Sequence, residues 1–289
     1  MAYKGRHINP RRFERSQIKI LLILLPLSLF MALPLVFIVN HAFKPMDELF
    51  AFPPTFFVRN PKLDNFTKLI KFSRIAGIPL TRYLFNSLAV TVLTVGLALL
   101  LTTCAAFAFS KIRFRGRSLM LQINQIAIMF VSTAVLIPRY LVISRLGLID
   151  TILVHVLPLV AMPVALFLVK QFVDQVPDSL IEAAHLDGAS DLQVYRRIIL
   201  PIIRPAVATA MVLVFQQVWT NMETSNYFTN DESMKTLTFY MNTLANVNNG
   251  VAGQGMAAAA SLIMFIPNLL LFIICQSAVM NTMATSGIK

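Results

Sequence analysis

The sequence predicts an all-α integral membrane protein with six transmembrane helices. Hydrophobic residues make up 57% of the 289 residues, charged residues make up only 13%, and the mean hydropathy is +0.70. Soluble domains carry about a quarter charged residues, so this composition excludes an ordinary soluble enzyme and a disordered chain. Cys104 and Cys275 both lie in apolar runs, so we expect neither a disulfide framework nor a cysteine-based metal site.

Six segments are apolar enough and long enough to cross a hydrocarbon core, which takes about 20 helical residues. They cover residues 18–39, 84–110, 119–138, 151–172, 206–222 and 255–279. The apolar stretch of the first is too long for a cleavable signal peptide, and no small-residue cleavage site follows it. The fifth is the weakest span, because Gln216, Gln217 and Asn221 crowd its far end.

Positive charges around the spans predict their orientation. Cations crowd before the first span and again at Lys111–Arg117, so both places are expected in the cytoplasm, together with both termini. The predicted parts are a basic N-terminus (1–17), an external segment (40–83), a core domain of five helices (84–279) with a cytoplasmic loop (173–205) and an external loop (225–254), and a cytoplasmic tail (280–289). The stretch 40–80 is an exception to the charge rule, since it is external yet carries six Lys and Arg.

The connection between the fourth and fifth spans has the most specific local pattern. Pro177 can start a short helix, and Gly188 can end it because glycine accepts the left-handed backbone conformation. Ser190 and Gln193 match a capping box that starts a second helix, which we expect Pro201 to end. The pattern therefore predicts a helix, a tight turn and a second helix projecting from the membrane.

The connection also contains a longer spaced pattern, made up of Glu182, Ala183, Ala184, Gly188, Ile198, Leu200 and Pro201. At this spacing, the pattern resembles the EAA loop of permease subunits in binding-protein-dependent ABC importers. Asp187, Gly188, Ala189 and Pro205 also match the form that the loop takes in the carbohydrate-uptake branch, the maltose-transporter permease type. The resemblance extends over most of the chain, although the part before the second span matches mainly by pattern.

The resemblance implies the type I ABC importer fold, with a cytoplasmic coupling helix that docks on an ATPase subunit. The expected docking core is Glu182, Ala183, Ala184, Asp187 and Gly188, while Leu200 and Pro201 would fix how the loop rejoins the fifth span. Such a chain is a transport subunit of a bacterial or archaeal plasma membrane. It is not an enzyme and holds no cofactor, because partner subunits bind ATP and Mg, and this sequence has no P-loop pattern.

The same resemblance implies a set of partners. They are two copies of an ABC ATPase subunit, a second permease subunit that is usually a different chain, an extracytoplasmic solute-binding protein, the lipid bilayer and a sugar or oligosaccharide. No nucleic acid is expected. The external loop (225–254) resembles the loop that in this family reaches into the cleft of the binding protein, and a plain solvated loop is the alternative.

A second group of candidate residues lies around the outer end of the fifth span. It consists of Gln217, Trp219, Asn221, Glu223 and Asn226. An aromatic ring that stacks on a sugar, with amides that bond its hydroxyls, is the expected chemistry of a carbohydrate site. The alternative is an interfacial anchor whose amides hold helices together. For His155, inside the fourth span, we expect a hydrogen bond between helices and no ligand role.

Two other functions fit parts of the sequence. The first is an ABC importer permease for a non-sugar solute, such as an amino acid or a peptide. The second is a polytopic membrane enzyme of the prenyltransferase type, which binds magnesium through pairs of aspartates. Two pairs in this chain superficially resemble such motifs: Asp174 with Asp178, and Asp187 with Asp191. Both pairs lie in one loop, whereas such enzymes need two motifs that face each other across helices.

Overall fold

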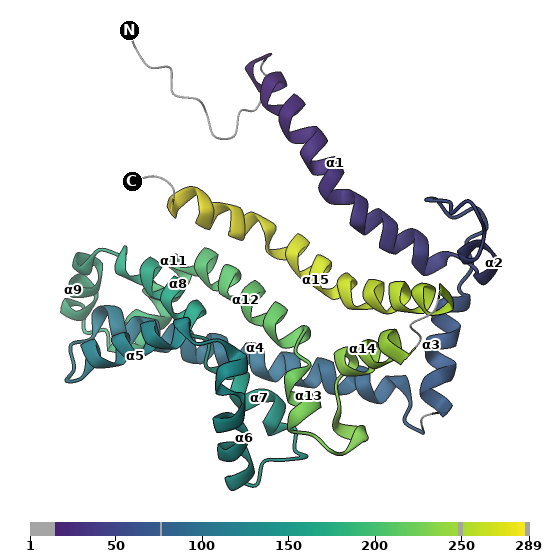
Figure 1. Cartoon of the computed structure of the whole chain (residues 1–289). Coiled ribbons are helices and arrows are strands. Elements are labelled where there is room, and N and C mark those ends of the chain that lie inside the picture. The colour runs from purple at the N-terminus through teal and green to yellow at the C-terminus, as the bar shows by residue number, and fades with distance from the viewer. Residues whose placement is uncertain (1–14, 76, 248–250, 287–289) are drawn as a thin grey trace.

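The computed structural model describes residues 15–75, 77–247 and 251–286, and within these ranges it contains helices and no strands (Figure 1). The predicted N-terminal residues 1–14 and the last three residues of the predicted tail lie outside the described residues. Three helices are individually long and apolar enough to span a membrane: α1 (Arg15–Phe43), α4 (Leu80–Lys111) and α15 (Val251–Ser286). These correspond to the predicted first, second and sixth spans.

Three further spans are possible only if pairs of helices joined by a bend each count as one. The first pair is α5 (Arg117–Met129) with η1 (Ser132–Val135) and α6 (Leu136–Arg145), bent by 110°. The second is α7 (Leu153–Val160) with α8 (Pro163–Asp174), bent by 44°. In the third, the segment Asp191–Ile202 meets Arg204–Tyr227 at 80°. The described chain therefore has three to six candidate spans.

The predicted third and fourth spans each contain a break, which has a local cause. Phe130 and Val131 have extended backbones, which ends α5 before the predicted segment is complete. Met162 is also extended, and the residue before a proline is pushed away from the helical conformation, so Pro163 starts a new helix. A hydropathy average over many residues does not detect either break.

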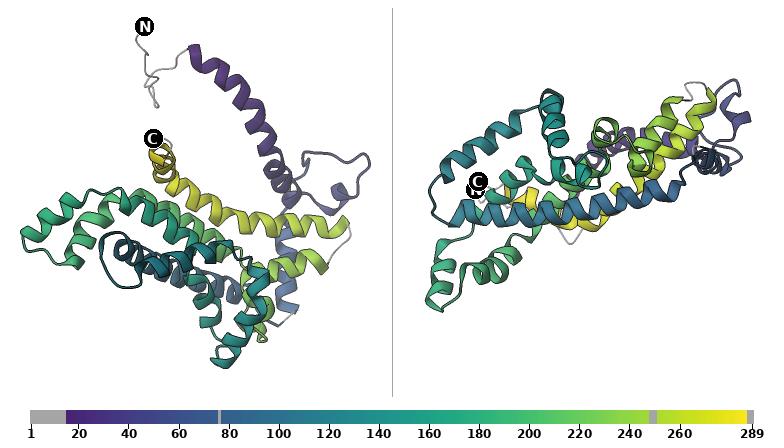
Figure 2. Two further views of the ribbon diagram at one scale, coloured as in Figure 1. Left: turned by 60° about the vertical axis from the view of Figure 1, so that its left-hand side comes forward. Right: turned by 90° about the horizontal axis from the view of Figure 1, so that it is seen from below.

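The remaining helices are short. They are α2 (Met46–Leu49), α3 (Asp64–Ile75), α9 (Asp178–Leu186), α10 (Asp191–Val194), the π-helical η2 (Tyr195–Ile199), α11 (Leu200–Ile202), α12 (Arg204–Trp219), α13 (Glu223–Tyr227), η3 (Glu232–Met234) and α14 (Leu237–Val247). Figure 2 shows that the α9–α11 hairpin projects from the bundle. The N-terminal end of α1 and the C-terminal end of α15 lie on the same side of the molecule as α9, whereas α2 and α3 lie on the other side (Figure 1).

The main core forms where α4, α8, α12 and η2 meet. Small and branched residues without any exposed area line this contact, among them Ala98, Ala106, Val169, Ile199 and Val214. Small side chains let membrane helices approach closely, which is how association proceeds where lipid is the solvent. The core thus joins the long helix α4 to the segment that contains the predicted EAA residues.

Helix α1 joins the rest of the chain near its C-terminal end. The buried amide of Asn65 donates hydrogen bonds to the carbonyl groups of Ala42 (3.0 Å) and Lys44 (2.9 Å), which a helix end otherwise leaves unpaired. Gly255 of α15 lies against this amide, and a Cβ there would come within 2.8 Å of it. Along most of its length α1 exposes apolar side chains, which suits contact with lipid or another subunit.

Candidate functional site

The predicted turn at Gly188 is present and has the geometry that the sequence requires. Gly188 has a φ of +80°. Its N–H donates to the carbonyl of His185 at 3.0 Å, and the N–H of Ala189 donates to the carbonyl of Ala184 at 2.9 Å. These two bonds form the Schellman motif, which satisfies the last carbonyls of α9. Because no atom lies within 4 Å of a Cβ added at Gly188, the need for glycine is one of backbone conformation.

The second helix starts as predicted but ends later. Gln193 Oε1 accepts a hydrogen bond from the N–H of Ser190 at 2.8 Å, in a capping box. The helical path then continues through a π-helical turn and past Pro201 as far as Ile202. Pro201 was expected to end the helix. The helix instead ends one residue after it, at Ile202.

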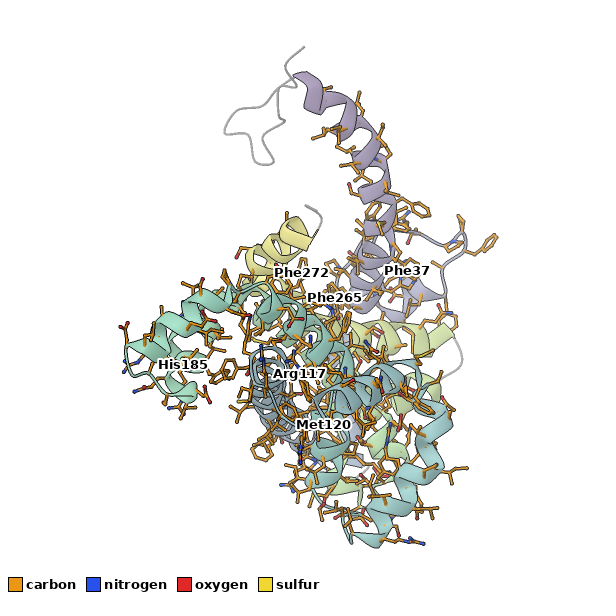
Figure 3. All side chains as sticks on the ribbon, turned by 90° about the vertical axis from the view of Figure 1, so that its left-hand side faces the viewer. Phe37, Arg117, Met120, His185, Phe265 and Phe272 are labelled. Atoms are coloured by element: carbon orange, nitrogen blue, oxygen red, sulfur yellow. The ribbon has the colours of Figure 1, made fainter. Side chains whose placement is uncertain are left out.

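The predicted docking residues divide into an exposed tip and an inner row. Glu182, Ala183, Asp187, Gly188 and Pro201 are exposed. Ala184, Ala189, Ile198 and Leu200 are half-buried and pack against the main core, which contains residues of the hairpin itself, such as Val194 and Tyr195, as well as residues of α4 and α8. Figure 3 labels His185 on this projecting hairpin. The tip is thus open to a partner, while the inner row holds the hairpin on the bundle.

Leu186 is a tip residue that the sequence analysis missed. It is the last residue of α9 and is 89% exposed, although moving a leucine side chain out of water is favourable. An exposed apolar side chain next to an acceptor such as Glu182 is typical of a contact surface. The residue's place between the EAA tripeptide and Gly188 was the signal that could have identified it.

Two contacts attach the hairpin to α4. Lys111 Nζ donates to the carbonyl of Val176 and to the carboxylate of Asp178, each at 2.6 Å, and this bond lowers the pKa of Asp178 below its ordinary 3.8. At the other end, the hydroxyl groups of Tyr195 and Thr103 lie 2.8 Å apart and are buried. In the sequence, Lys111 stands out only as one of the cations that orient the spans, because no pattern near it indicates its partners in the hairpin.

Trp219 occupies a packed position. Its side chain is 3% exposed, its indole N–H donates to the carbonyl of Met264 in α15 at 3.0 Å, and its ring stacks on Phe215. The indole therefore has no open face for a sugar in this structure. The indole joins α12 to α15, which is a packing contact between helices.

The other polar candidates are not brought together as one site. Gln217 and Asn226 are exposed. Asn221 Oδ1 accepts from the N–H of Thr224 at 3.1 Å, which stabilises the start of α13. Glu223 forms a half-buried ion pair with Arg139 of α6. Arg139 was missed because it follows directly after the predicted third span.

His155 has the interhelical role that the sequence predicts. It is buried in α7, where Nδ1 lies 2.8 Å from the hydroxyl of Thr224 and Nε2 lies 3.1 Å from the carbonyl of Met234. Met234 can only accept, so we assign the ring proton to Nε2. The histidine thereby fixes α13 and η3 against α7.

Most of the predicted external loop (225–254) is structured. Helix α14 packs against α4 and α15 and buries Leu237, Tyr240, Met241 and Leu244, so this part is not a plain solvated loop. The exposed stretch before it is held by Asp150, whose carboxylate accepts hydrogen bonds from the N–H groups of Asp231 and Asn230. These bonds lower the pKa of Asp150. Residues 248–250 lie outside the described residues.

Comparisons of the sequence with known proteins identify the family. Residues 22–277 match the family described as binding-protein-dependent transport system inner membrane component. The chain is 27% identical over 250 residues to an inner membrane ABC transporter permease protein of Escherichia coli, with 86% of this chain and 88% of that protein covered. It is 30% identical over 203 residues to an sn-glycerol-3-phosphate transport system permease protein of Agrobacterium fabrum, with 70% and 72% covered.

A third relative is a trehalose transport system permease protein of Mycobacterium tuberculosis, 26% identical over 263 residues, with 87% of this chain and 94% of that protein covered. Among solved structures, a bacterial ABC transporter involved in the import of the acidic polysaccharide alginate has a chain with a similar fold. The TM-score is 0.77 at 21% identity, and the match covers 93% of this chain and 99% of that one.

Members of this family are multi-pass transport subunits of the plasma membrane, which excludes the prenyltransferase-type enzyme considered above. They need no cofactor of their own. The chain, which matches over most of its length, belongs to the inner membrane components of binding-protein-dependent transport systems, the permease subunits of ABC importers.

Proposed function

We propose that this permease carries a sugar or oligosaccharide, as in the maltose-transporter branch, and that α9 is the coupling helix on which an ATPase subunit docks. The observation that carries the second part is the exposed EAA tip held by the left-handed turn at Gly188. Glu182 offers an acceptor to Arg or Lys of the partner, Leu186 offers an apolar contact, and Ala183 is small enough for close approach.

The two attachments to α4 support a path for the mechanical step. When two ATPase subunits close on ATP, α9 moves with them. Lys111 and Tyr195 then transmit that movement to α4, because each joins the hairpin to this long helix through a hydrogen bond. The movement of α4 would contribute to the change from an inward-open to an outward-open bundle.

The proposed orientation places both termini and the α9 hairpin in the cytoplasm. It is supported by the cationic residues around Lys111–Arg117 and by the common side on which α9 and the described ends of α1 and α15 lie (Figure 1). The proposed complex contains two ATPase subunits, a second permease subunit and an extracytoplasmic solute-binding protein.

The proposed solute is supported by the relatives. The names of two of them specify trehalose and sn-glycerol-3-phosphate, and a further relative is a sulfoquinovosyl glycerol transport permease of Agrobacterium fabrum. These names favour a saccharide or a polyol phosphate over an amino acid or a peptide. Within this chain, Gln217 and Asn226 have exposed side chains and are the proposed contacts for the solute along the path. Asn221 and Glu223 would have a structural role beside the path, through their bonds to Thr224 and Arg139.

The solute proposal is tested with the complete importer in proteoliposomes. Its binding protein, loaded in turn with a disaccharide, a polyol phosphate, an amino acid or a dipeptide, should stimulate ATP hydrolysis only with the disaccharide. Stimulation by any of the other three solutes without stimulation by the disaccharide would contradict the proposal.

The docking proposal has a separate test. A cysteine introduced at Ala183, in a chain whose two native cysteines are replaced by alanine, should cross-link to the ATPase subunit. A cysteine at Lys71 of α3, which is equally exposed, is the matched control and should not cross-link. Equal cross-linking at both positions, or none at Ala183, would contradict the docking role.

A further inference from the structure

The loop between α2 and α3 exposes several phenylalanine side chains. We call residues 50–58 the phenylalanine loop. Phe52 is 95% exposed, and Phe50 and Phe57 are also largely open. Phenylalanine is strongly disfavoured in water, so a cluster of exposed rings points to an apolar environment that the isolated chain lacks.

The conformation of this loop is fixed by side chains from α1, from α2 and from the connection between these two helices. Asn40 Oδ1 of α1 accepts a hydrogen bond from the N–H of Val58 at 3.0 Å, and the ammonium group of Lys44 donates to the carbonyl of Thr55. The carboxylate of Glu48 in α2 accepts from the two N–H groups that follow the loop, those of Arg59 (3.0 Å) and Asn60 (2.8 Å). The rings are therefore presented by a built loop.

The loop folds back along α1. The ring of Phe56 lies 6.1 Å from the ring of Phe37, and Phe57 packs edge-on against Phe56 at 5.1 Å. Phe37 is six residues before the last residue of α1, so the loop reaches about 9 Å back from the end of that helix at 1.5 Å per residue. Figures 1 and 2 show the loop beside the α2 end of α1, and Figure 3 labels Phe37 there.

We propose that the phenylalanine loop is an interfacial wedge that inserts its rings into the lipid leaflet around the α2 end of α1. Helix α1 has the length and apolarity of a membrane span, and its exposed apolar surface is continuous with the loop through Phe37 and Phe56. A ring at the depth of Phe37 therefore meets the same lipid as α1 itself.

Three positions of the loop have backbones that suit this environment. Non-helical backbone next to lipid is costly where its N–H groups lack partners. Pro53 and Pro54 have no N–H to satisfy, and the N–H of Val58 is paired with Asn40. At the loop's end, the exposed cations Arg59 and Lys62 are placed where anionic lipid headgroups attract positive charge. Contact with headgroups would also explain why these two cations occur in a segment predicted to be external, although Lys and Arg are usually enriched in cytoplasmic loops.

The second permease subunit or the solute-binding protein could instead cover the rings, and spin labels distinguish these cases. The complete importer is reconstituted in phosphatidylethanolamine–phosphatidylglycerol vesicles, with Cys104 and Cys275 replaced by alanine. A nitroxide is attached at Phe52→Cys or at Phe57→Cys, and Lys71→Cys is the control. Collision rates are measured with oxygen, which concentrates in lipid, and with a nickel complex, which stays in water.

We expect the ratio of oxygen to nickel collision rates to be several-fold higher at positions 52 and 57 than at position 71. Nickel accessibility at 52 and 57 equal to that at 71 would place the loop in water and overturn the proposal. Immobile labels with low accessibility to both reagents would show that a protein partner covers the rings, which overturns it equally. The two loop positions are independent, so failure of one variant to assemble leaves the other to decide.

Discussion

Lys111, in the last turn of α4, donates hydrogen bonds at 2.6 Å to both the carbonyl of Val176 and the carboxylate of Asp178. The lysine side chain is almost buried at 7% exposure, whereas the aspartate side chain is open. The cation is thus held by the bundle, and its partner sits in the first turn of the proposed coupling helix. In the proposed mechanism, movement of α9 would act on α4 at this point.

Replacing this lysine should weaken coupling. In Lys111→Met we expect transport per ATP hydrolysed to fall several-fold, while the complex still assembles. Lys170→Met is the matched control, because the side chain of Lys170 pairs with Asp174, four residues along the same helix. The measurement is the ratio of solute taken up to phosphate released in proteoliposomes. An equal fall in both variants would show that the effect is not specific to the α4–α9 contact.

The Lys111–Asp178 contact should be insensitive to pH near neutrality and weaken in acid. The lysine lowers the pKa of Asp178 below 3.8, so the ionised carboxylate stabilises the folded state above that value. This stabilisation is lost as the pH falls through the lowered pKa. The difference in Tm between the wild type and Asp178→Asn should be constant around neutral pH and shrink below pH 3.8. A difference that grows in acid would contradict this assignment.

Gly188 should tolerate a side chain poorly for reasons of backbone conformation alone. A left-handed backbone costs an L-residue about 1–2 kcal/mol, and a β-branched residue is affected most. We expect Gly188→Val to stay in the membrane but to lose ATP hydrolysis stimulated by the loaded binding protein. Gly96→Val is the control, because Gly96 lies inside α4, has no atom within 4 Å of an added Cβ and has no positive φ. Retained stimulation in Gly188→Val would refute the coupling role of the turn.

Trp219 should behave as a packing residue. Removing a buried tryptophan side chain costs about 3–5 kcal/mol, so Trp219→Ala should reduce uptake and ATP turnover together through loss of folded complex. Trp219→Phe, which keeps a ring against Phe215, should retain more of both. In contrast, Asn226 is exposed and is a proposed solute contact, so Asn226→Ala should lower uptake while ATP turnover is retained. Loss of uptake with normal ATP turnover in Trp219→Ala would contradict this packing role and would indicate a direct contact between the indole and the solute.

The parts of the fold that depend on local chemistry could be predicted from the sequence. The left-handed turn at Gly188 and the capping box at Ser190 are fixed by residues within a few positions, and both are present. The apolar length of α1, α4 and α15 is likewise a property of each segment alone. The break at Phe130 and Val131 has no proline or glycine to mark it, so no local pattern could predict it.

The candidate sites depended more on contacts between distant segments. The indole of Trp219 is buried because its N–H meets the carbonyl of Met264, a partner that no pattern around Trp219 specifies. Glu223 pairs with Arg139 of α6 for the same kind of reason. Residue types near the end of a span could therefore indicate a polar cluster, but they could not show whether its side chains are open to a solute or buried in contacts between helices.

The attachment of α1 through Asn65 and Gly255 has a consequence for biosynthesis. A helix that satisfies most of its own backbone bonds and exposes an apolar surface along most of its length is stable in lipid before its neighbours arrive. Helix α1 can therefore enter the bilayer as a finished unit while the rest of the chain is still being made. The later arrival of α15 then completes the joint, because its glycine leaves the room that the asparagine amide occupies.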